Sequence, residues 1–309
     1  MDEIGQIRSF NRTVTQHIGA LVTGFLGRDR PLGASRLLFE IGPDGIEVRR
    51  LRDRLELDSG YASRLLRALE AEGLVRTGPG ADDARVRVAS LTAAGRRELA
   101  LLNRRSDESA AALLERLTPE QRAALTAAMG TVERLLLAGA VGLEVVDPAG
   151  RAARYCVQQY FQELAHRFEG GFDPARSISA GDDELRPPRG YFVLATLHGD
   201  AVGCGALKCH PDFGELKRMW VAPEARGLGL GRRILGGLEE LARNRRLPLL
   251  RLETNQSLVE AQRLYRTSGY REVAAFNDEA YAHHWFEKRL APASASSRAR
   301  GPVQPRRRP

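Results

Sequence analysis

The feature that most constrains the fold of this chain is a glycine-rich loop between a strand-like run and an amphipathic helix. The strand-like run covers residues 214–221, and Pro223 ends it. Gly227, Gly229 and Gly231 follow, and apolar residues then recur at helical spacing. Glycine lets the backbone bring successive amide N–H groups close to a ligand, and the first turn of a helix favours anions. The sequence therefore predicts a strand, loop and helix that together bind an anionic group such as a pyrophosphate.

The order of residues in this loop excludes two common phosphate-binding motifs. Residues 226–231 read Arg-Gly-Leu-Gly-Leu-Gly, without the Gly-Lys-Ser/Thr end of a Walker loop or the Gly-x-Gly-x-x-Gly order of a dinucleotide site. Taken alone, the glycines are better explained as a structural turn. The interpretation as a binding loop therefore depends on its surroundings.

A second signature follows the loop. A strand-like run at 249–254 precedes Asn255, a helix containing residues 261–265 and the sequence Ser-Gly-Tyr-Arg-Glu at 268–272. Together with the run from Glu215 to Pro223, this signature resembles the GNAT acetyltransferase superfamily over about residues 151–290. The resemblance implies an α+β fold with a mixed central sheet and acetyl-CoA as the co-substrate. No metal motif accompanies it, and we expect no metal cofactor.

Acetyl transfer to an amine requires a base that removes a proton from the attacking nitrogen. We predict that Glu215 is this base; the alternative is a surface ion pair with Lys217 on the same face of the strand. Tyr265 occupies the family position of the acid that protonates the departing thiolate, and its alternative role is packing against the cofactor. The resemblance also implies that backbone N–H groups of residues 219–221, at a strand bulge, stabilise the carbonyl oxygen.

The loop and its neighbours are predicted to bind the cofactor. Asn255 would cap the following helix, bind the pantetheine arm, or do both. The predicted cofactor-binding residues are Met219, Trp220, Val221, Arg226, Gly227, Leu228, Gly229, Leu230, Gly231, Arg232, Asn255 and Tyr265.

The cysteines and histidines favour no metal site. Cys204, Cys209 and His210 lie close in sequence but lack a fourth ligand at metal spacing, and buried strand cysteines are the favoured interpretation. His283 and His284 alternate along a predicted last strand at 281–288, so one of them points inward as a core or substrate-wall residue.

Helical periodicity dominates residues 1–140, with helices expected at 2–26, 32–41, 47–55, 59–72, 92–116 and 119–138. The turn at 56–58 gives two of these helices helix-turn-helix spacing. The apolar positions predicted to be buried in the second of them are Ala62, Leu65, Leu66 and Leu69. The outward residues predicted to bind DNA are Ser59, Tyr61, Ser63, Arg64 and Arg67.

Two short strands at 74–77 and 85–88 would form a wing around a turn at 78–83. Arg85 and Arg87 alternate with valines, and we predict that both bind DNA. Each piece alone also fits an ordinary helix or hairpin with solvated arginines. The ordered set, followed by Leu-Thr-Ala-Ala-Gly at 91–95, resembles the MarR family of winged-helix regulators over residues 5–138.

The MarR resemblance implies a homodimer that pairs through its first and last helices and binds double-stranded DNA at a palindromic site. Ala81-Asp82 departs from the basic residue that is usual between two acids in the wing, and this predicts weaker binding of DNA by the wing.

The two patterns meet near residue 145, where the run at 147–150 reads Asp-Pro-Ala-Gly. The predicted organisation is a mainly α winged helix-turn-helix domain at 1–140, a linker at 141–150, the GNAT domain at 151–291 and a disordered basic tail at 292–309. The tail holds five arginines and no acid, so most of the net charge of +8 lies there and does not argue for DNA binding. The first residues lack a signal-peptide pattern and no run reaches ~18 apolar residues, so we expect a cytoplasmic protein.

Three hypotheses follow. The chain is a regulator that also acetylates a small amine or amino acid, a regulator whose second domain only senses acyl-CoA or another ligand, or an enzyme whose winged helix serves only dimerisation. The presence of both Glu215 and Tyr265 favours the first.

Overall fold

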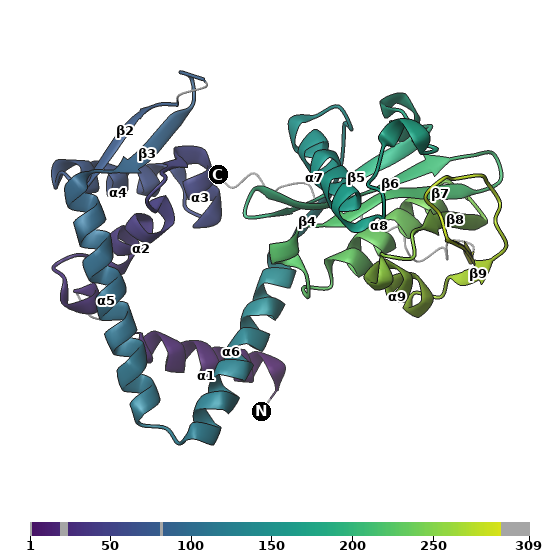
Figure 1. The fold of residues 1–309 in the computed structure, drawn as a ribbon. Coiled ribbons are helices and arrows are strands. Elements are labelled where there is room, and N and C mark those ends of the chain that lie inside the picture. Colours follow the sequence, from purple (N-terminus) through teal and green to yellow (C-terminus); the bar gives the residue numbers. More distant parts are fainter. Residues whose placement is uncertain (1, 19–23, 81–82, 292–309) are drawn as a thin grey trace. The chain divides into compact units, whose positions relative to one another are not determined.

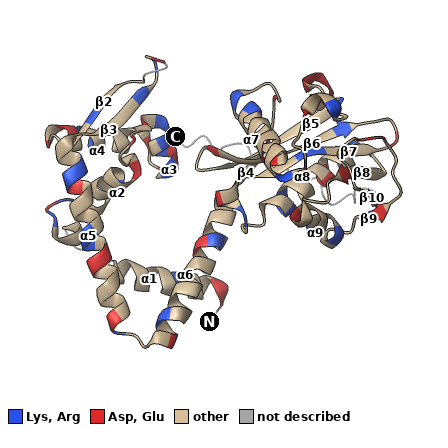
Figure 2. Cartoon of the chain, viewed as in Figure 1, with Lys and Arg blue, Asp and Glu red and all other residues tan. Residues whose placement is uncertain are grey.

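The computed structural model describes residues 2–18, 24–80 and 83–291, and the chain divides into two compact units, Met1–Thr131 and Val132–Pro309 (Figure 1). The predicted disorder of the tail at 292–309 and the departure at Ala81-Asp82 lie outside the described residues. Lys and Arg are spread over both units rather than gathered on one (Figure 2). The basic excess of the sequence therefore marks neither unit as the one that binds nucleic acid.

The first unit combines helices with a three-stranded antiparallel sheet in the order β1-β3-β2. Its elements are α1 (Glu3–His17), a 3₁₀ turn (Phe25–Gly27), α2 (Leu32–Ile41), β1 (Ile46–Glu47), α3 (Val48–Arg54), α4 (Ser59–Ala71), β2 (Val75–Pro79), β3 (Arg87–Leu91), α5 (Ala93–Glu115) and the start of α6 (Pro119–Ala140). The four predicted apolar positions of α4 are all buried, which confirms the helical period. Three of them, Leu65, Leu66 and Leu69, join residues of α2, α5 and the sheet in one apolar core.

The prediction of one continuous helix over 2–26 is wrong. α1 ends at His17, and Phe25–Gly27 form a separate 3₁₀ turn. The backbone at Gly24 is extended and Leu26 has a φ of 51°, so a helix cannot continue through them. Arg28 and Arg30 follow, and both donate to the carboxylate of Glu98 on α5, which fixes this irregular segment against the bundle.

The second unit is built on a seven-stranded mixed sheet in the order β4-β5-β6-β7-β8-β10-β9, which confirms the predicted fold class. Its helices and strands are β4 (Gly142–Val146), α7 (Arg151–Arg167), β5 (Gly190–Leu197), β6 (Asp200–Cys209), β7 (Gly214–Val221), α8 (Leu230–Asn244), β8 (Leu249–Thr254), α9 (Val259–Thr267), β9 (Arg271–Val273) and β10 (His284–Arg289). The predicted strand at 281–288 thus begins later, at His284.

The predicted linker at 141–150 is instead part of the second unit. Val141 is buried in its core, and β4 pairs antiparallel with β5 from Gly142 to Val146. The sequence signal at 147–150 marks the turn between β4 and α7 rather than a boundary between units. The chain passes between the units within α6, because one unit ends at Thr131 and the next begins at Val132.

Strands β7 and β8 are parallel but pair only at their first residues. The registered pairs are Gly214 with Leu250 and Glu215 with Arg251, and β7 continues to Val221 without further pairing to β8. The strands therefore diverge toward their carboxyl ends, where ligands commonly bind in sheets with parallel strands. Side chains from the later part of both strands line the cavities described next.

Candidate functional site

The glycine loop forms the N-terminal end of α8, as the sequence predicted. Gly227 and Gly229 have φ angles of 81° and 73°, in the left-handed region that favours glycine, and Gly229 is the N-cap of α8. A Cβ atom at either glycine would meet no atom within 4 Å, so the loop faces open space. The first N–H groups of a 15-residue helix therefore border an unfilled volume, as an anion site requires.

This volume belongs to a cavity that the predicted cofactor-binding residues surround. All of them line it except Leu228, whose side chain is buried, and Asn255. Four arginines also line it: Arg167, Arg226, Arg232 and Arg263. Sequence reasoning missed Arg167 and Arg263, because both lie far from the loop in the sequence and reach the cavity only in the folded chain. The cavity thus combines helix N–H groups with positive charge.

Strand β7 carries a bulge at the point where it leaves β8. The pairing of β6 with β7 shifts register between Cys204 and Ala206, and Arg218 has a φ of 54°. A positive φ is costly for a residue with a side chain, and such strain concentrates at functional sites. The bulge agrees with the one that the family resemblance implies near Met219, and the use of its N–H groups as oxyanion donors stays a prediction.

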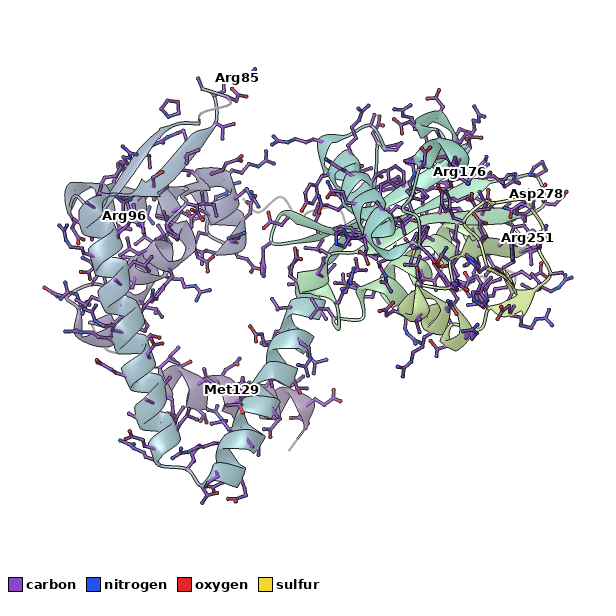
Figure 3. The ribbon with its side chains drawn as sticks, in the orientation of Figure 1. Arg85, Arg96, Met129, Arg176, Arg251 and Asp278 are labelled. Carbon is purple, nitrogen blue, oxygen red and sulfur yellow. The ribbon has the colours of Figure 1, made fainter. Side chains whose placement is uncertain are left out.

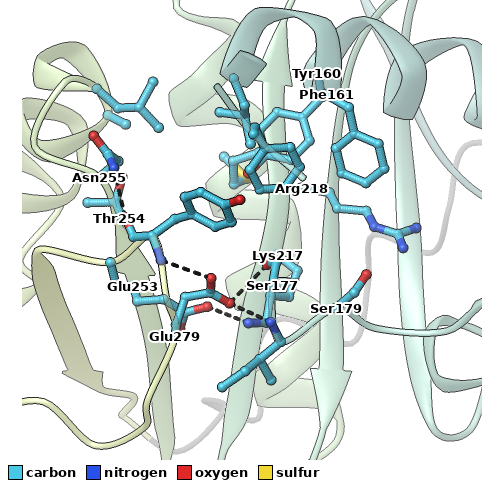
Figure 4. Close-up of a pocket in the computed structure, with 18 of the residues that line it drawn as sticks. Tyr160, Phe161, Ser177, Ser179, Lys217, Arg218, Glu253, Thr254, Asn255 and Glu279 are labelled. Atoms are coloured by element: carbon cyan, nitrogen blue, oxygen red, sulfur yellow. Dashed lines mark hydrogen bonds and ion pairs between the residues drawn. The ribbon is translucent and has the colours of Figure 1, made fainter. Parts of the chain in front are cut away.

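A second cavity adjoins the first. Both are lined by Tyr160, Met219 and Tyr265, so these three side chains lie where the cavities meet. The second cavity extends between α7 and the carboxyl ends of β7 and β8, with Lys217, Arg218 and Glu253 among its lining residues (Figure 4). An acyl group carried in the first cavity could therefore meet an acceptor held in the second.

Tyr265 is suited to donate a proton at this junction. Its side chain is buried, and burial raises the pKa of the hydroxyl well above its ordinary value, with Glu253 contributing in the same direction. The phenol therefore stays protonated at neutral pH. No hydrogen bond of this hydroxyl is recorded among the described residues, so its proton is not committed to another acceptor. Its role as an acid stays a prediction.

The structure places Glu215 differently from the sequence prediction. Glu215 is buried and lines neither cavity; it lies 3.0 Å from Lys217 Nζ and 3.0 Å from His210 Nε2. Burial would raise its pKa, but Lys217 and His210 together hold the pKa below its ordinary value. The ion pair that we gave as the alternative is present, although it is buried rather than at the surface.

Glu253 is the carboxylate that the sequence analysis missed. It lies in β8, lines the second cavity and forms a buried ion pair with Lys217. Burial raises its pKa above the ordinary value, although Lys217 opposes the shift. The available signal was its position near the carboxyl end of the strand at 249–254, where parallel neighbours open toward ligands.

Asn255 uses its side chain to shape the loop after β8. Its Oδ1 accepts from Ser257 N at 2.9 Å and its Nδ2 donates to the Tyr281 carbonyl at 2.7 Å. The N-cap of α9 is Leu258, so Asn255 is not the helix cap that we considered. Asn255 lines the second cavity, and its predicted bond to pantetheine stays untested.

The winged-helix unit exposes every residue of α4 that we predicted to bind DNA: Ser59, Tyr61, Ser63, Arg64 and Arg67. Their exposure follows from the burial of the opposite face of the helix. The guanidinium of Arg64 lies over the ring of Tyr61, 5.6 Å from its centroid. Basic groups on an exposed helix of this kind are available to a DNA groove.

The wing is shifted along the chain from its predicted position. β3 starts at Arg87, so Arg85 lies in the turn before it and does not share a strand face with Arg87. Asp83 Oδ1 accepts hydrogen bonds from the backbone N–H and from the side-chain Nε of Arg85. This Asx-type contact holds Arg85 out of the ladder. Arg85 lies near the tip of the hairpin (Figure 3) and its side chain is 91% exposed.

Two helices present apolar side chains to solvent. They come from α1 and its C-cap, with Ile4, Ile7, Phe10, Val14 and Ile18, and from α6, with Leu135, Leu136 and Met129. Figure 3 labels Met129 on α6. By length and composition α6 could also cross a membrane, and it is the one such helix among the described residues. The sequence analysis expected no apolar run long enough to span a membrane, and α6 meets that test of length and composition. Nevertheless, α6 carries charges at Glu120, Arg122, Glu133 and Arg134.

The cysteines and histidines occupy ordinary positions. Cys204 is buried in β6 and Cys209 is half-buried, while His284 pairs with Glu272 and His283 is exposed in the turn before β10. Within residues 2–18, 24–80 and 83–291, no group of three His, Cys, Asp or Glu side chains could hold a metal ion.

Known proteins resemble each unit. The sequence model described as the Acetyltransferase (GNAT) family matches residues 157–270, and the one described as the MarR family matches residues 28–86. An IAA acetyltransferase of Azospirillum brasilense is 38% identical over 123 residues, which is 39% of this chain and 80% of the relative. An uncharacterised N-acetyltransferase of Schizosaccharomyces pombe is 33% identical over 132 residues, 39% of this chain and 75% of the relative. Among solved structures, the ribosomal-protein-S18-alanine N-acetyltransferase of Escherichia coli is 17% identical with a TM-score of 0.38, covering 50% of this chain and 97% of the other.

Proposed function

Because the chain belongs to the GNAT acetyltransferase family and carries a MarR-family winged helix before that domain, we propose that it is a DNA-binding regulator that also acetylates amines. The acetyl group moves from acetyl-CoA to a primary amine of a small molecule or amino acid. The observation that carries this proposal is the meeting of two cavities at Tyr265 and Met219, with Glu253 lining one and the glycine loop lining the other.

In the proposed mechanism the helix N–H groups and surrounding arginines bind the pyrophosphate of acetyl-CoA. Glu253 accepts a proton from the amine, whose nitrogen then forms a bond to the acetyl carbon. As the carbon–sulfur bond breaks, the thiolate takes a proton from Tyr265. Lys217 and Glu215 position Glu253 rather than touching the reacting atoms, because Lys217 bridges the two carboxylates.

A thiol-release assay with acetyl-CoA and a panel of primary amines tests the enzyme. We expect CoA release that depends on the amine, together with an acetylated product of the matching mass. Tight binding of acetyl-CoA without turnover of any amine would instead support a sensor.

The sensor is a second candidate because of Arg233, in the first turn of the helix that follows the glycine loop. Its guanidinium donates to the carbonyl of Val141 at 2.8 Å and also to that of Ala138 at the end of α6. Helix α6 continues from the winged-helix unit, so cofactor binding at α8 is linked through the chain to that unit. DNA affinity measured with and without acetyl-CoA separates the candidates: coupling without turnover supports the sensor.

The regulator is proposed to act as a cytoplasmic homodimer. Burial of the apolar residues of α1 and α6 against a second copy would explain why both helices expose them in one chain. Analytical ultracentrifugation is expected to give twice the chain mass of 34.0 kDa, and Ile7→Asp, which places a charge in the exposed apolar stripe of α1, should give the monomer mass.

A further inference from the structure

The wall of the acceptor cavity is aromatic. Phe168 and Tyr281 have ring centroids 5.7 Å apart, and each contacts Phe172, at 5.8 and 4.9 Å. Phe161 extends the group, 5.4 Å from Phe172. All four rings line the cavity that also holds Glu253. A flat apolar group packs well against such rings, because aromatic pairs favour tilted and edge-on contacts of the kind already present among them.

The cavity is also lined by one cation, Arg218, that forms no direct ion pair among the described residues. Arg218 is half-buried at the β7 bulge and donates to the carbonyl of Ala180 at 2.6 Å. Burial lowers the pKa of Arg218, and the charge of Asp182 opposes this shift from beyond ion-pair distance. A half-buried guanidinium whose counter-charge, Asp182, is not in direct contact is only partly compensated, so an anionic group in contact with Arg218 would stabilise the site.

The other charged groups that line the cavity already have partners. Lys217 and Glu253 pair with each other. Glu279 accepts from Ser177 Oγ at 2.9 Å and from Ile178 N at 2.6 Å, so it holds two wall segments together. Within the described part of the chain, Arg218 is therefore the cation lining this cavity that has no direct ion pair and that an anionic ligand could neutralise.

Arg218 also reaches beyond this cavity. Together with Phe161 it lines a neighbouring cavity that contains Arg154 and Asp182, so the acceptor site is open on that side. An acceptor longer than the aromatic pocket has room to place an acidic group there.

We propose that the acetyl acceptor is an aromatic amine that carries an acidic group. Its ring packs against the aromatic wall, its amine faces Glu253, and its acid binds the guanidinium of Arg218. This inference rests on the proposed acetyltransferase function and deepens it, because it names the chemical class of the acceptor.

Four matched amines test the class. L-phenylalanine has the acid beside the amine, 4-(2-aminoethyl)benzoic acid has it across the ring, 2-phenylethylamine lacks it, and L-alanine lacks the ring. We expect kcat/KM for at least one of the two aromatic acids to exceed that for both 2-phenylethylamine and L-alanine by about 10-fold to 100-fold, since a charge-assisted bond to a buried arginine discriminates strongly. If kcat/KM with 2-phenylethylamine equals or exceeds that of both aromatic acids, the requirement for an acidic group is wrong. If kcat/KM with L-alanine equals that of the aromatic acids, the requirement for an aromatic ring is wrong.

Two variants locate the acid. Arg218→Met should reduce the preference for the aromatic acid over 2-phenylethylamine to near unity, and the ratio of the two kcat/KM values cancels any loss of activity that both amines share. Arg189→Met is the matched control, because Arg189 is exposed in the same unit and lines neither the acceptor cavity nor the neighbouring one. It should leave the preference unchanged, and an unchanged preference in Arg218→Met would overturn the assignment.

Calorimetric titration of the same amines into the protein with bound CoA separates this inference from the proposed function. The aromatic acid should bind at least 10-fold more tightly than 2-phenylethylamine in the wild type even if no acetyl transfer occurs. Turnover of simple amines without this order of affinities would leave the enzyme in place and overturn the acceptor class.

Discussion

The ammonium of Lys217 forms a buried ion pair with the carboxylate of Glu253, and it is this carboxylate that lines the acceptor cavity. On the other side, Lys217 lies 3.0 Å from Glu215 Oε1, which faces neither cavity. Lys217 thus lies between two buried carboxylates. Glu253 lines the acceptor cavity, whereas Glu215 does not. The functional difference between them follows from their positions.

Replacement of Glu253 by Gln should lower kcat by about 100-fold to 10,000-fold, because the amine loses its proton acceptor. Acetyl-CoA affinity should stay within a few-fold, since Glu253 does not line the cofactor cavity. Steady-state kinetics and calorimetry measure these two quantities. Glu215→Gln is the matched control and should reduce kcat much less. A larger loss of kcat in Glu215→Gln than in Glu253→Gln would instead identify Glu215 as the base.

Glu215 should also make stability depend on pH. Its folded-state pKa lies below the ordinary 4.5, so its ion pairs contribute stability that is fully present above that value and is lost as the pH falls through the folded pKa. The free energy of unfolding should therefore decline less steeply in acid for Glu215→Gln than for the wild type. Urea denaturation at a series of pH values tests this. Glu144→Gln, at an exposed position of β4, is the control; parallel curves for Glu215→Gln and the wild type would contradict the prediction.

Replacement of Tyr265 by Phe should lower kcat by at least about 10-fold without weakening acetyl-CoA binding, because the ring is kept and only the proton donor is removed. Single-turnover kinetics measure the chemical step directly. Intact turnover would mean that Tyr265 only packs against the cofactor. Tyr160→Phe provides a comparison, because Tyr160 lines the same junction but is not the proton donor in the proposed mechanism.

Local periodicity predicted much of this fold. The buried face of α4 and the strand at 249–254 follow directly from the spacing of apolar residues. Contacts between distant segments were harder to predict. β4 was taken for a linker because its partner β5 lies beyond α7 in the chain.

The same limit applies to the choice of base between Glu215 and Glu253. Alternation along β8 says only that Arg251 and Glu253 share a face. Whether that face meets a cavity depends on the divergence of β8 from β7, which is a tertiary property. Glu215 belongs to the recognisable signature but lies in the part of β7 that is still paired with β8, where no cavity opens.

The loop glycines predict a selective loss of cofactor binding. Gly229→Ala places a side chain at a φ of 73°, which costs about 1–2 kcal/mol and disturbs the N–H groups at the start of α8. We expect the Kd for acetyl-CoA to rise about 10-fold or more. Gly73→Ala is a matched control, because Gly73 has a φ of 68° and equally open surroundings but lies in the winged-helix unit. It should lower stability by a similar amount and leave cofactor affinity unchanged; equal loss of affinity in both variants would refute the local explanation.

The exposed arginines of α4 predict salt-dependent DNA binding. Arg64 and Arg67 lie on the face opposite the buried leucines, so both can reach phosphates or base edges in a major groove. Replacement of both by Ala should weaken binding to a mixed-sequence duplex at low salt by about 10-fold or more. It should also reduce the slope of log affinity against log salt by about one unit for each phosphate that the variant no longer neutralises. Fluorescence anisotropy at several salt concentrations measures affinity and slope together. Arg97→Ala is the control, because Arg97 is exposed on α5, away from the helix-turn-helix. If the double variant keeps both the affinity and the slope of the wild type, α4 is not the recognition helix, and the winged-helix unit serves dimerisation alone.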